Sequence, residues 1–282
     1  MKNILVATDL SERSDRAVDR AALIAKQMNA MLHIVYVVDD EVTSTIALAC
    51  EENATLELQR QIKEGPLFQG VQTSIHVEFG HTWKMITKLA EEQEVDLVVL
   101  GTHRNRGIRD LFTGTTLHRI ARTCPAPFLI AAERATHAYA NVFVGVDFSD
   151  CARNATQIAA RIAPGQPLTL VHAYHIPFKA LTMHVDEHGD IAIRERRRIE
   201  AEIDEQMTRF IASLENVQPA PNFIVKEGGA VPVLQAEVTA GKADLVCIGS
   251  HSKPWLVEAL LGNNAMEVMS HPPCDVLVAP LR

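Results

Sequence analysis

The sequence ILVATDLSERSDRAVDRAALIA at residues 4–25 returns, with conservative changes, as VFVGVDFSDCARNATQIAARIA at residues 142–163. A constant offset of 138 residues places Asp9 on Asp147 and the alanines of the first segment on those of the second. A repeat that spans half of a chain predicts two copies of one fold, because each copy must bury its own apolar face.

The repeat continues further along the chain. The segment DLVVLGTH at 96–103 matches DLVCIGSH at 244–251, now at an offset of 148, so the second copy carries ten additional residues. We place this insertion within residues 175–197, where a strand should end and a helix begin, since extra residues in a surface connection cost little folding free energy. Residues 132–140 form the expected seam.

Each half reads as alternating strands and helices, with predicted domains at 1–135 and 140–282. The expected strands of the first half are NILVAT (3–8), MLHIVYVV (31–38), SIHVEF (74–79), DLVVLG (96–101) and PFLIAA (127–132), with NVFVGV, PLTLVHAY, NFIVKE, DLVCIG and DVLVAP as their counterparts. Nearly continuous apolar strands are typical of a parallel sheet with helices on both faces. The prediction is an α/β chain of two tandem doubly wound domains, each a five-stranded, mainly parallel sheet.

The expected helices support this fold. Ser11 and Ser149 are suited to cap the first helix of each half. Small and apolar residues recur behind Ser11 at spacings of three and four, which predicts a helix that lies close to the sheet. These are Ala17, Ala21, Ile24, Ala25 and Met28. A second stripe, with the charged run RERRR on its solvated side, comprises Ile199, Ile203, Met207, Phe210 and Leu214.

Composition excludes several classes of protein. The 282 residues are 47% hydrophobic and 22% charged, with a net charge of −8, which favours solubility and argues against non-specific nucleic-acid binding. The five cysteines form no C-x-x-C pair, so we expect reduced thiols. No apolar run approaches the roughly 20 residues of a membrane span, and the start MKNILVATD lacks the pattern of a secretory signal, so we expect a cytoplasmic protein without membrane contact.

Two similar loops follow the fourth strand of each half. They read GTHRNRGIRDLFTGTT at 101–116 and GSHSKPWLVEALLGNN at 249–264, each with a glycine at the strand end and another before a helix start. Glycines let a backbone approach a phosphate, and the N–H groups at a helix N-terminus bind anions. The alternative is that the glycines make tight turns and Thr115 is an ordinary N-cap.

These residues resemble the universal stress proteins in a tandem form. The resemblance rests on Asp9-Leu10-Ser11 and Asp147-Phe148-Ser149, on the glycine loops, and on the closing segments CPAPFLIA and PPCDVLVAP, and it covers nearly the whole chain. The resemblance implies a binding and signalling module of the stress response. In the nucleotide-binding members of this family, adenosine phosphates lie across the pattern G-x2-G-x9-G-(S/T), and a second branch lacks both the pattern and ATP binding.

The first half matches this pattern in part. Gly101, Gly114 and Thr115 agree with it and Thr116 follows, but Arg104 replaces the second glycine. That arginine either fills the phosphate position or holds a phosphate through a charge-assisted hydrogen bond. Arg106 and Arg109 raise the positive charge of the loop against the single carboxylate of Asp110, which favours an anionic ligand, ATP or AMP.

The resemblance also implies roles for residues outside the loop. It places Asp9 near the base and ribose, and Val37 or Val38 against the adenine. Asp9 has the alternative role of bracing its own turn. In the second half Ser252 and Asn263 replace pattern residues, so we expect that copy to bind nucleotide weakly or not at all.

Other chemistries find little support. The sequence contains no G-x4-G-K-[ST] loop, no G-x-G-x-x-G after a strand and no G-x-S-x-G, so no catalytic residue is nominated. His184 and His188 would share a helix face only if the insertion were helical, and an exposed loop is favoured there over a metal site. For His103 and His251, beside the glycine loops, a structural role is favoured over a ligand contact.

The sequence therefore favours a non-catalytic binding module over an enzyme. Two alternatives stay open: slow ATP hydrolysis, with Asp9 and Asp110 as the nearby candidates, and a nucleotide-free protein scaffold. The fifth strands, PFLIAA and DVLVAP, should pair within the chain and make an internal pseudo-dimer, because a free sheet edge must be covered. Dimerisation of the whole chain and the identity of partners are left open.

Overall fold

The computed structural model describes residues 1–38, 44–102, 116–176, 189–250 and 263–280. The first half comprises β1 (Asn3–Thr8), α1 (Glu12–Met28), β2 (Met31–Val38), α2 (Ser44–Glu64), η1 (Pro66–Phe68), β3 (Thr73–Phe79), α3 (Thr82–Glu92), β4 (Leu97–Gly101), α4 (Thr116–Thr123) and β5 (Phe128–Ala131). The second half comprises β6 (Val142–Gly145), α5 (Asp150–Ile162), β7 (Leu168–Tyr174), α7 (Gly189–Ala212), β8 (Asn222–Glu227), α8 (Ala230–Ala240), β9 (Leu245–Gly249), α9 (Asn263–Ser270) and β10 (Asp275–Ala279).

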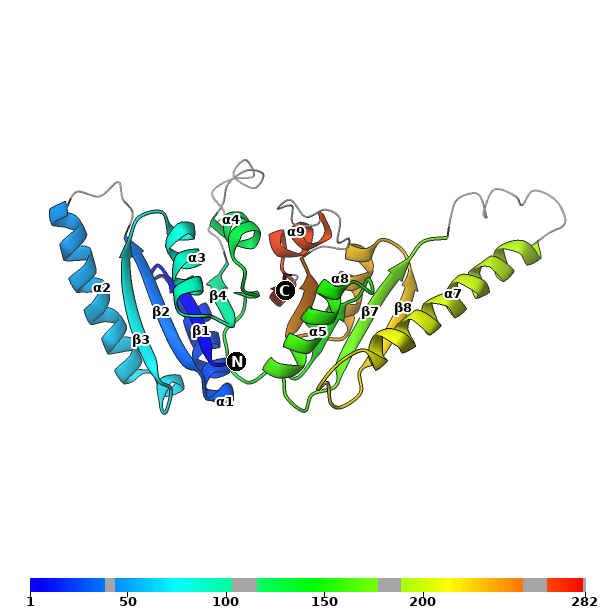
Figure 1. Ribbon diagram of the computed structural model, residues 1–282, viewed down its shortest axis with the longest axis horizontal. Coiled ribbons are helices and arrows are strands. Elements are labelled where there is room, and N and C mark those ends of the chain that lie inside the picture. Colours follow the sequence, from blue (N-terminus) through cyan, green and yellow to red (C-terminus); the bar gives the residue numbers. More distant parts are fainter. Residues whose placement is uncertain (39–43, 103–115, 177–188, 251–262, 281–282) are drawn as a thin grey trace.

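The strands of both halves form one sheet in the order β3-β2-β1-β4-β5-β10-β9-β6-β7-β8 (Figure 1). Neighbouring strands are parallel within each half, and β5 and β10 pair antiparallel, with Ile130 opposite Val276 and Phe128 opposite Val278. The predicted meeting of the two fifth strands is confirmed. The α/β class and the tandem, doubly wound arrangement of parallel strands are confirmed as well.

Helices cover both faces of this sheet, and the two halves share the layers. One buried cluster joins residues of α1, α2, α5 and α7, and the cluster on the opposite face joins residues of α3, α4, α8 and α9. Both clusters therefore run across the junction between the halves, and α2 and α7 lie at opposite ends of the molecule (Figure 1). Within the described ranges, no helix combines the length and the apolar character that crossing a bilayer requires.

The first helix of each half begins as the sequence predicts. Ser11 accepts a hydrogen bond from the backbone N–H of Ser14, and Ser149 accepts one from Ala152, so both serines are N-caps. The alanine stripe of α1 is fully buried, as are its counterparts in α5, which include Ala155. The small side chains allow both helices to lie close to the sheet.

Two aspartates hold the first strand of each half against the fourth. The carboxylate of Asp96 accepts hydrogen bonds from the backbone amides of residues 2–3 at 2.5 and 3.2 Å. The carboxylate of Asp244 accepts them from residues 140–141 at 2.8 and 3.1 Å. The repeated contact fixes where β1 and β6 enter the sheet.

The structure resolves the register of the second strand. Val35 lies opposite Ala7, and Val171 lies opposite Gly145, so β2 and β7 correspond at an offset of 136 residues. The connection from β2 to α2 covers residues 39–43, whereas the connection from β7 to α7 covers residues 175–188. The additional length of the second copy therefore lies at the end of its second strand, as the sequence predicts.

A buried ion pair joins the halves beside the β5–β10 junction. Arg20 Nε lies 2.9 Å from Asp275 Oδ2, and the Tyr139 hydroxyl donates to the same oxygen at 2.6 Å. The other carboxylate oxygen accepts from the backbone amides of residues 132–133, and the Arg20 guanidinium also donates to the carbonyl of His137. The guanidinium carbon stands 4.1 Å from the centre of the Tyr139 ring. The seam between the copies is thus part of the junction.

This cluster occurs on one side of the pseudo-dimer only. The residue corresponding to Arg20 in the second copy is Ile158, and the residue corresponding to Asp275 in the first copy is Pro127. A buried charge without a partner is costly, so each charged residue requires the other.

We expect Asp275→Asn to lower the free energy of unfolding by about 3–5 kcal/mol, because the fully buried Arg20 loses its counter-charge while the side-chain shape is kept. Urea denaturation followed by circular dichroism measures this loss. Glu205→Gln, which breaks an exposed ion pair on α7, should change stability by less than about 0.5 kcal/mol. Equal effects of the two substitutions would contradict the assigned role of the buried pair.

Two imidazoles meet on β2 and β3. His33 Nδ1 lies 3.1 Å from His76 Nε2, and His33 is buried. Burial lowers the pKa of both rings below the ordinary value of 6.5, and for His33 the nearby His76 lowers it further. The unfolded chain therefore takes up protons near that pH more readily than the folded chain, so stability is complete above about pH 6.5 and falls as the pH drops toward the lowered pKa values.

The variant His33→Thr, which introduces the residue of the matching position 169, should lose less stability than the unaltered chain on acidification. Thermal or urea melts at about pH 7.5 and about pH 5.5 measure the difference. A variant that lost just as much stability on acidification would show that this imidazole pair does not contribute to the pH dependence.

Candidate functional site

An identical turn follows the first strand of each half. Asp9 Oδ1 accepts hydrogen bonds from the backbone amide and the hydroxyl of Ser11, at 3.0 and 2.5 Å. Asp147 Oδ1 accepts the same pair from Ser149, at 3.1 and 2.5 Å. The carboxylate-to-amide contact two residues on is an Asx-turn, which accounts for the Asp-x-Ser pattern in the sequence.

The residue at the centre of each turn is held in the left-handed region. Leu10 has φ 60° and Phe148 has φ 63°, a conformation that bulky residues seldom adopt. The pKa of Asp9 lies below its ordinary value, because the hydrogen bonds from Ser11 outweigh the effect of its partial burial, which would raise it. Asp9 therefore braces its turn and presents a charged carboxylate at the exposed edge of the sheet.

The structure brings four of the predicted site residues to one edge of the first half. Asp9 follows β1, Val37 lies near the end of β2, Gly101 ends β4, and Thr116 begins α4. The point between β1 and β4 is where the strand order reverses, and parallel sheets bind ligands beyond their carboxyl ends at such a point. The other three predicted residues, Arg104, Gly114 and Thr115, lie outside the described residues. His103, His184, His188 and His251, whose roles the sequence analysis considered, also lie outside the described residues.

The strand-end glycines have a packing role that the sequence did not reveal. A Cβ atom on Gly249 would lie 2.7 Å from Cys151 Cβ, and one on Gly101 would lie 3.1 Å from the carbonyl oxygen of Arg13. Each glycine thus lets the strand end approach the first turn of α5 or α1. The sequence interpretation left two roles open for these glycines, close approach of the backbone to a phosphate or a tight turn, and did not predict this packing against a helix.

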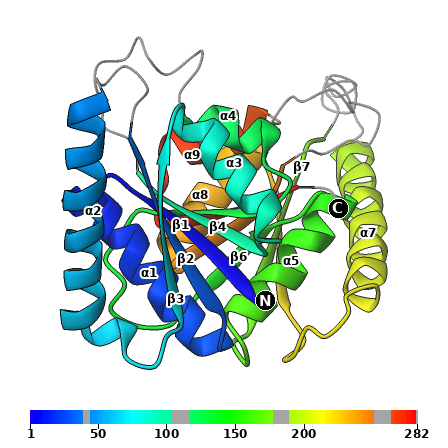
Figure 2. The ribbon, with the colours of Figure 1, turned by 60° about the vertical axis from the view of Figure 1, so that its left-hand side comes forward.

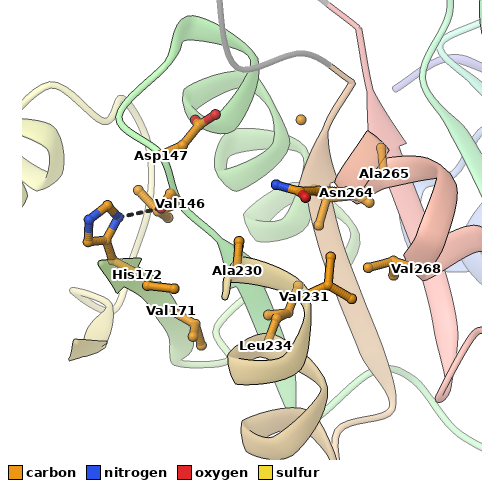
Figure 3. A pocket seen from close by; sticks show the side chains of 14 residues that line it. Val146, Asp147, Val171, His172, Ala230, Val231, Leu234, Asn264, Ala265 and Val268 are labelled. Atoms are coloured by element: carbon orange, nitrogen blue, oxygen red, sulfur yellow. Dashed lines mark hydrogen bonds between the residues drawn. The ribbon is translucent and has the colours of Figure 1, made fainter. Parts of the chain in front are cut away.

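A cavity of about 120 Å³ opens at the corresponding edge of the second half (Figure 3). Its walls are small or aliphatic side chains from four elements of one sheet face, which are Val171, Ala173, Ala230, Val231, Leu234, Ile248, Ala265 and Val268. Asp147 and Asn264 stand at its rim. Gly145 also lines the cavity, and a Cβ added there would meet Leu234 and Ile248 at 3.3 Å. The cavity suits a flat, largely apolar group with a polar edge.

His172 fixes the strand beside this cavity. Its Nδ1 donates to the carbonyl of Val146 at 2.7 Å (Figure 3), and its ring lies 4.5 Å from the ring of Phe148. This contact ties the second strand to the end of β6 and so supports the position of Asp147. The histidine itself packs as a structural side chain.

Larger side chains occupy the matching positions of the first half. Trp83 corresponds to Val231 and Leu117 to Ala265, and both pack against the core cluster of that face. The strand register also makes Ala173, a wall residue of the cavity, the counterpart of Val37. Sequence reasoning missed the α8 and α9 wall residues and Trp83, although aligning α3 with α8 at the 148-residue offset points to them.

Neither half offers an evident metal centre in the described ranges, since no group of three or more His, Cys, Asp or Glu side chains there could hold a metal ion. The described residues of the two sites offer a carboxylate, an amide, backbone amides at helix N-termini and apolar walls. Groups of this kind are suited to binding and orienting a molecule.

Gly249→Ala should lower the free energy of unfolding by about 1–3 kcal/mol, because its new methyl group would overlap the Cys151 side chain and the backbone of α5. Gly101→Ala should cost less, since its nearest contact is longer. Urea denaturation of the two variants measures the difference. A larger loss from Gly101→Ala would contradict the packing role.

Comparison with known proteins gives one consistent result. The sequence profile of the universal stress protein family matches residues 1–132 and again residues 138–280. Universal stress protein A homolog 1 of Coxiella burnetii is 33% identical over 120 residues, covering 39% of this chain and 82% of that protein. A solved universal stress protein from Archaeoglobus fulgidus aligns with a TM-score of 0.67 at 17% identity, covering 99% of this chain and 98% of that chain. A functionally unknown protein from Pseudomonas aeruginosa PAO1 aligns with a TM-score of 0.68 at 18% identity, over 99% and 92% of the two chains.

Proposed function

Since the chain belongs to the universal stress protein family, we propose that it is a non-catalytic binding and signalling module of the stress response whose ligand is an adenine nucleotide, ATP or AMP. In this proposal the nucleotide occupies the first half, and the second half retains a reduced site. The protein acts in the cytoplasm, without a membrane or nucleic-acid partner.

The observation that carries the proposal is that Asp9, Val37, Gly101 and Thr116 all lie at the carboxyl-end edge of the sheet in the first half, where the strand order reverses between β1 and β4. Asp9 follows β1, two of the others end or nearly end strands, and Thr116 begins a helix, so only the fold brings them to one edge. Asp9 offers a charged carboxylate to ribose hydroxyls, Val37 offers an apolar surface to a base, and the first turn of α4 offers backbone donors to a phosphate.

The charge of the loops before α4 and α9 supports placing the phosphates in the first half. Arg104, Arg106 and Arg109 stand against Asp110 in the loop before α4. The corresponding loop of the second half balances Lys253 with Glu258 and gives no excess of positive charge. Arg104 would hold a phosphate as a charge-assisted donor, with Gly114, Thr115 and Thr116 at the helix start.

The cavity of the second half supports a weaker, phosphate-independent site. Its apolar walls suit a purine ring, and Asp147, the counterpart of Asp9, stands at its rim. Without a cationic loop, this copy gains little from phosphates. An adenosine and an ATP molecule should therefore bind the second half with similar affinity.

Calorimetry on nucleotide-free protein tests the assignment. Gly114→Val should weaken ATP binding at the first site by about tenfold or more, because a branched side chain blocks the expected approach of the backbone to a phosphate. Ala173→Trp, which fills the second-half cavity from β7, should leave that ATP binding unchanged. It should abolish any adenosine binding in the second half.

The alternatives predict different results. An absence of heat with ATP, AMP and adenosine would remove the ligand claim and favour the nucleotide-free scaffold. Slow hydrolysis would appear as phosphate release that Asp9→Asn abolishes and Asp147→Asn, its matched control, leaves intact. Phosphate release unaffected by Asp9→Asn would remove the enzymatic assignment.

A further inference from the structure

An exposed, positively charged surface covers α3 and α4 of the first half. It consists of Lys84 and Lys88 on α3 and Arg119 and Arg122 on α4, with the half-buried ring of Trp83 between the two helices. The helices lie side by side on one face of the sheet (Figure 2). We call these five residues the basic α3–α4 surface.

The tryptophan ring holds two of these cations. Lys84 Nζ lies 5.6 Å and the Arg119 guanidinium carbon 5.4 Å from the ring centre of Trp83. A cation over an aromatic face is attracted by the ring without being neutralised by it. Both side chains are therefore positioned while their positive charge stays available to a partner.

Within the described residues, little of this positive charge is neutralised by carboxylates. Among the residues that the structure describes, none forms an ion pair with Lys84, Arg119 or Arg122. Lys88 pairs with Glu92 at 3.7 Å, and both side chains are more than half exposed. Such an exposed pair is weak and exchanges readily for a better partner.

The fold does not require this surface. The matching positions on α8 and α9 carry Val231, Pro232, Ala236, Glu267 and Ser270, without one cation. The second copy thus builds the same pair of helices with neutral and acidic side chains. On a chain of net charge −8, four exposed cations gathered on this helix pair, and not on its counterpart, need a reason other than folding.

We propose that the basic α3–α4 surface docks a short acidic segment of a partner protein. Arginine and tryptophan are the residues that most often contribute binding energy at protein interfaces. The eight residues of α4 span only about 12 Å, which fits a few carboxylates of a peptide better than a long phosphate backbone. The surface carries one aromatic ring, whereas single-stranded nucleic acids bind along successive stacking rings. The net negative charge of the chain also repels an extended polyanion.

A fluorescein-labelled peptide of four glutamates, which when extended is about as long as α4, tests the proposal by fluorescence anisotropy at low salt. The triple variant Lys84→Gln, Arg119→Gln and Arg122→Gln should bind this peptide about tenfold more weakly, because three exposed charge contacts are lost. The control variant carries Arg197→Gln, Arg198→Gln and Arg209→Gln on α7, an equal change in net charge. It should keep most of the affinity.

Three outcomes would overturn the proposal. The first is no binding at roughly 1 mM peptide. The second is equal weakening by the α7 control, which would show attraction to overall charge. The third is tighter binding of a thymidine oligonucleotide or of phosphatidylserine vesicles, lost in the same α3–α4 variant. The titrations use nucleotide-free protein and are repeated with Gly114→Val. Peptide binding is thus measured without nucleotide, and its result does not depend on whether the first half binds ATP.

Discussion

The antiparallel pairing of β5 with β10 is the constraint on which the rest of the structure depends. A doubly wound half ends its sheet at the fifth strand, where unpaired N–H and C=O groups would invite aggregation. Pairing the two ends removes both edges at once and makes a single sheet. Because the sheet is continuous, both helix layers and both apolar clusters continue across the junction. The stability of each half therefore includes contacts with the other.

Local patterns in the sequence predicted most of this architecture. The β-branched segments, the capping serines and the buried stripe of α1 are short-range features, and the duplication allowed each one to be checked twice. Sequence reasoning did not predict features that depend on contacts between distant parts of the chain. The pairing of Arg20 with Asp275 has no counterpart in the repeat, so comparing the halves could not reveal it, and the cavity depends on how α8 and α9 pack over the strands. Part of the predicted site, including Arg104 and Thr115, lies outside the described residues.

The two copies share a turn and differ in its surroundings. Asp9 and Asp147 make the same two hydrogen bonds, which preserves an exposed carboxylate at equivalent points. Small residues such as Ala265 line a cavity in the second half, whereas Leu117 and Trp83 occupy the matching positions in the first, where Trp83 also contacts two surface cations. The same edge of the sheet thus carries an apolar recess in one copy and a charged surface in the other.

The buried pair of Arg20 and Asp275 also makes the halves non-interchangeable. Two amino-terminal halves assembled about the same axis would twice enclose a guanidinium opposite Pro127, and two carboxyl-terminal halves would enclose two carboxylates opposite Ile158. Either arrangement isolates a charge in an apolar interior. Each half therefore supplies a buried charge that only the other half neutralises, and neither half could replace the other in a symmetric dimer without losing this pair.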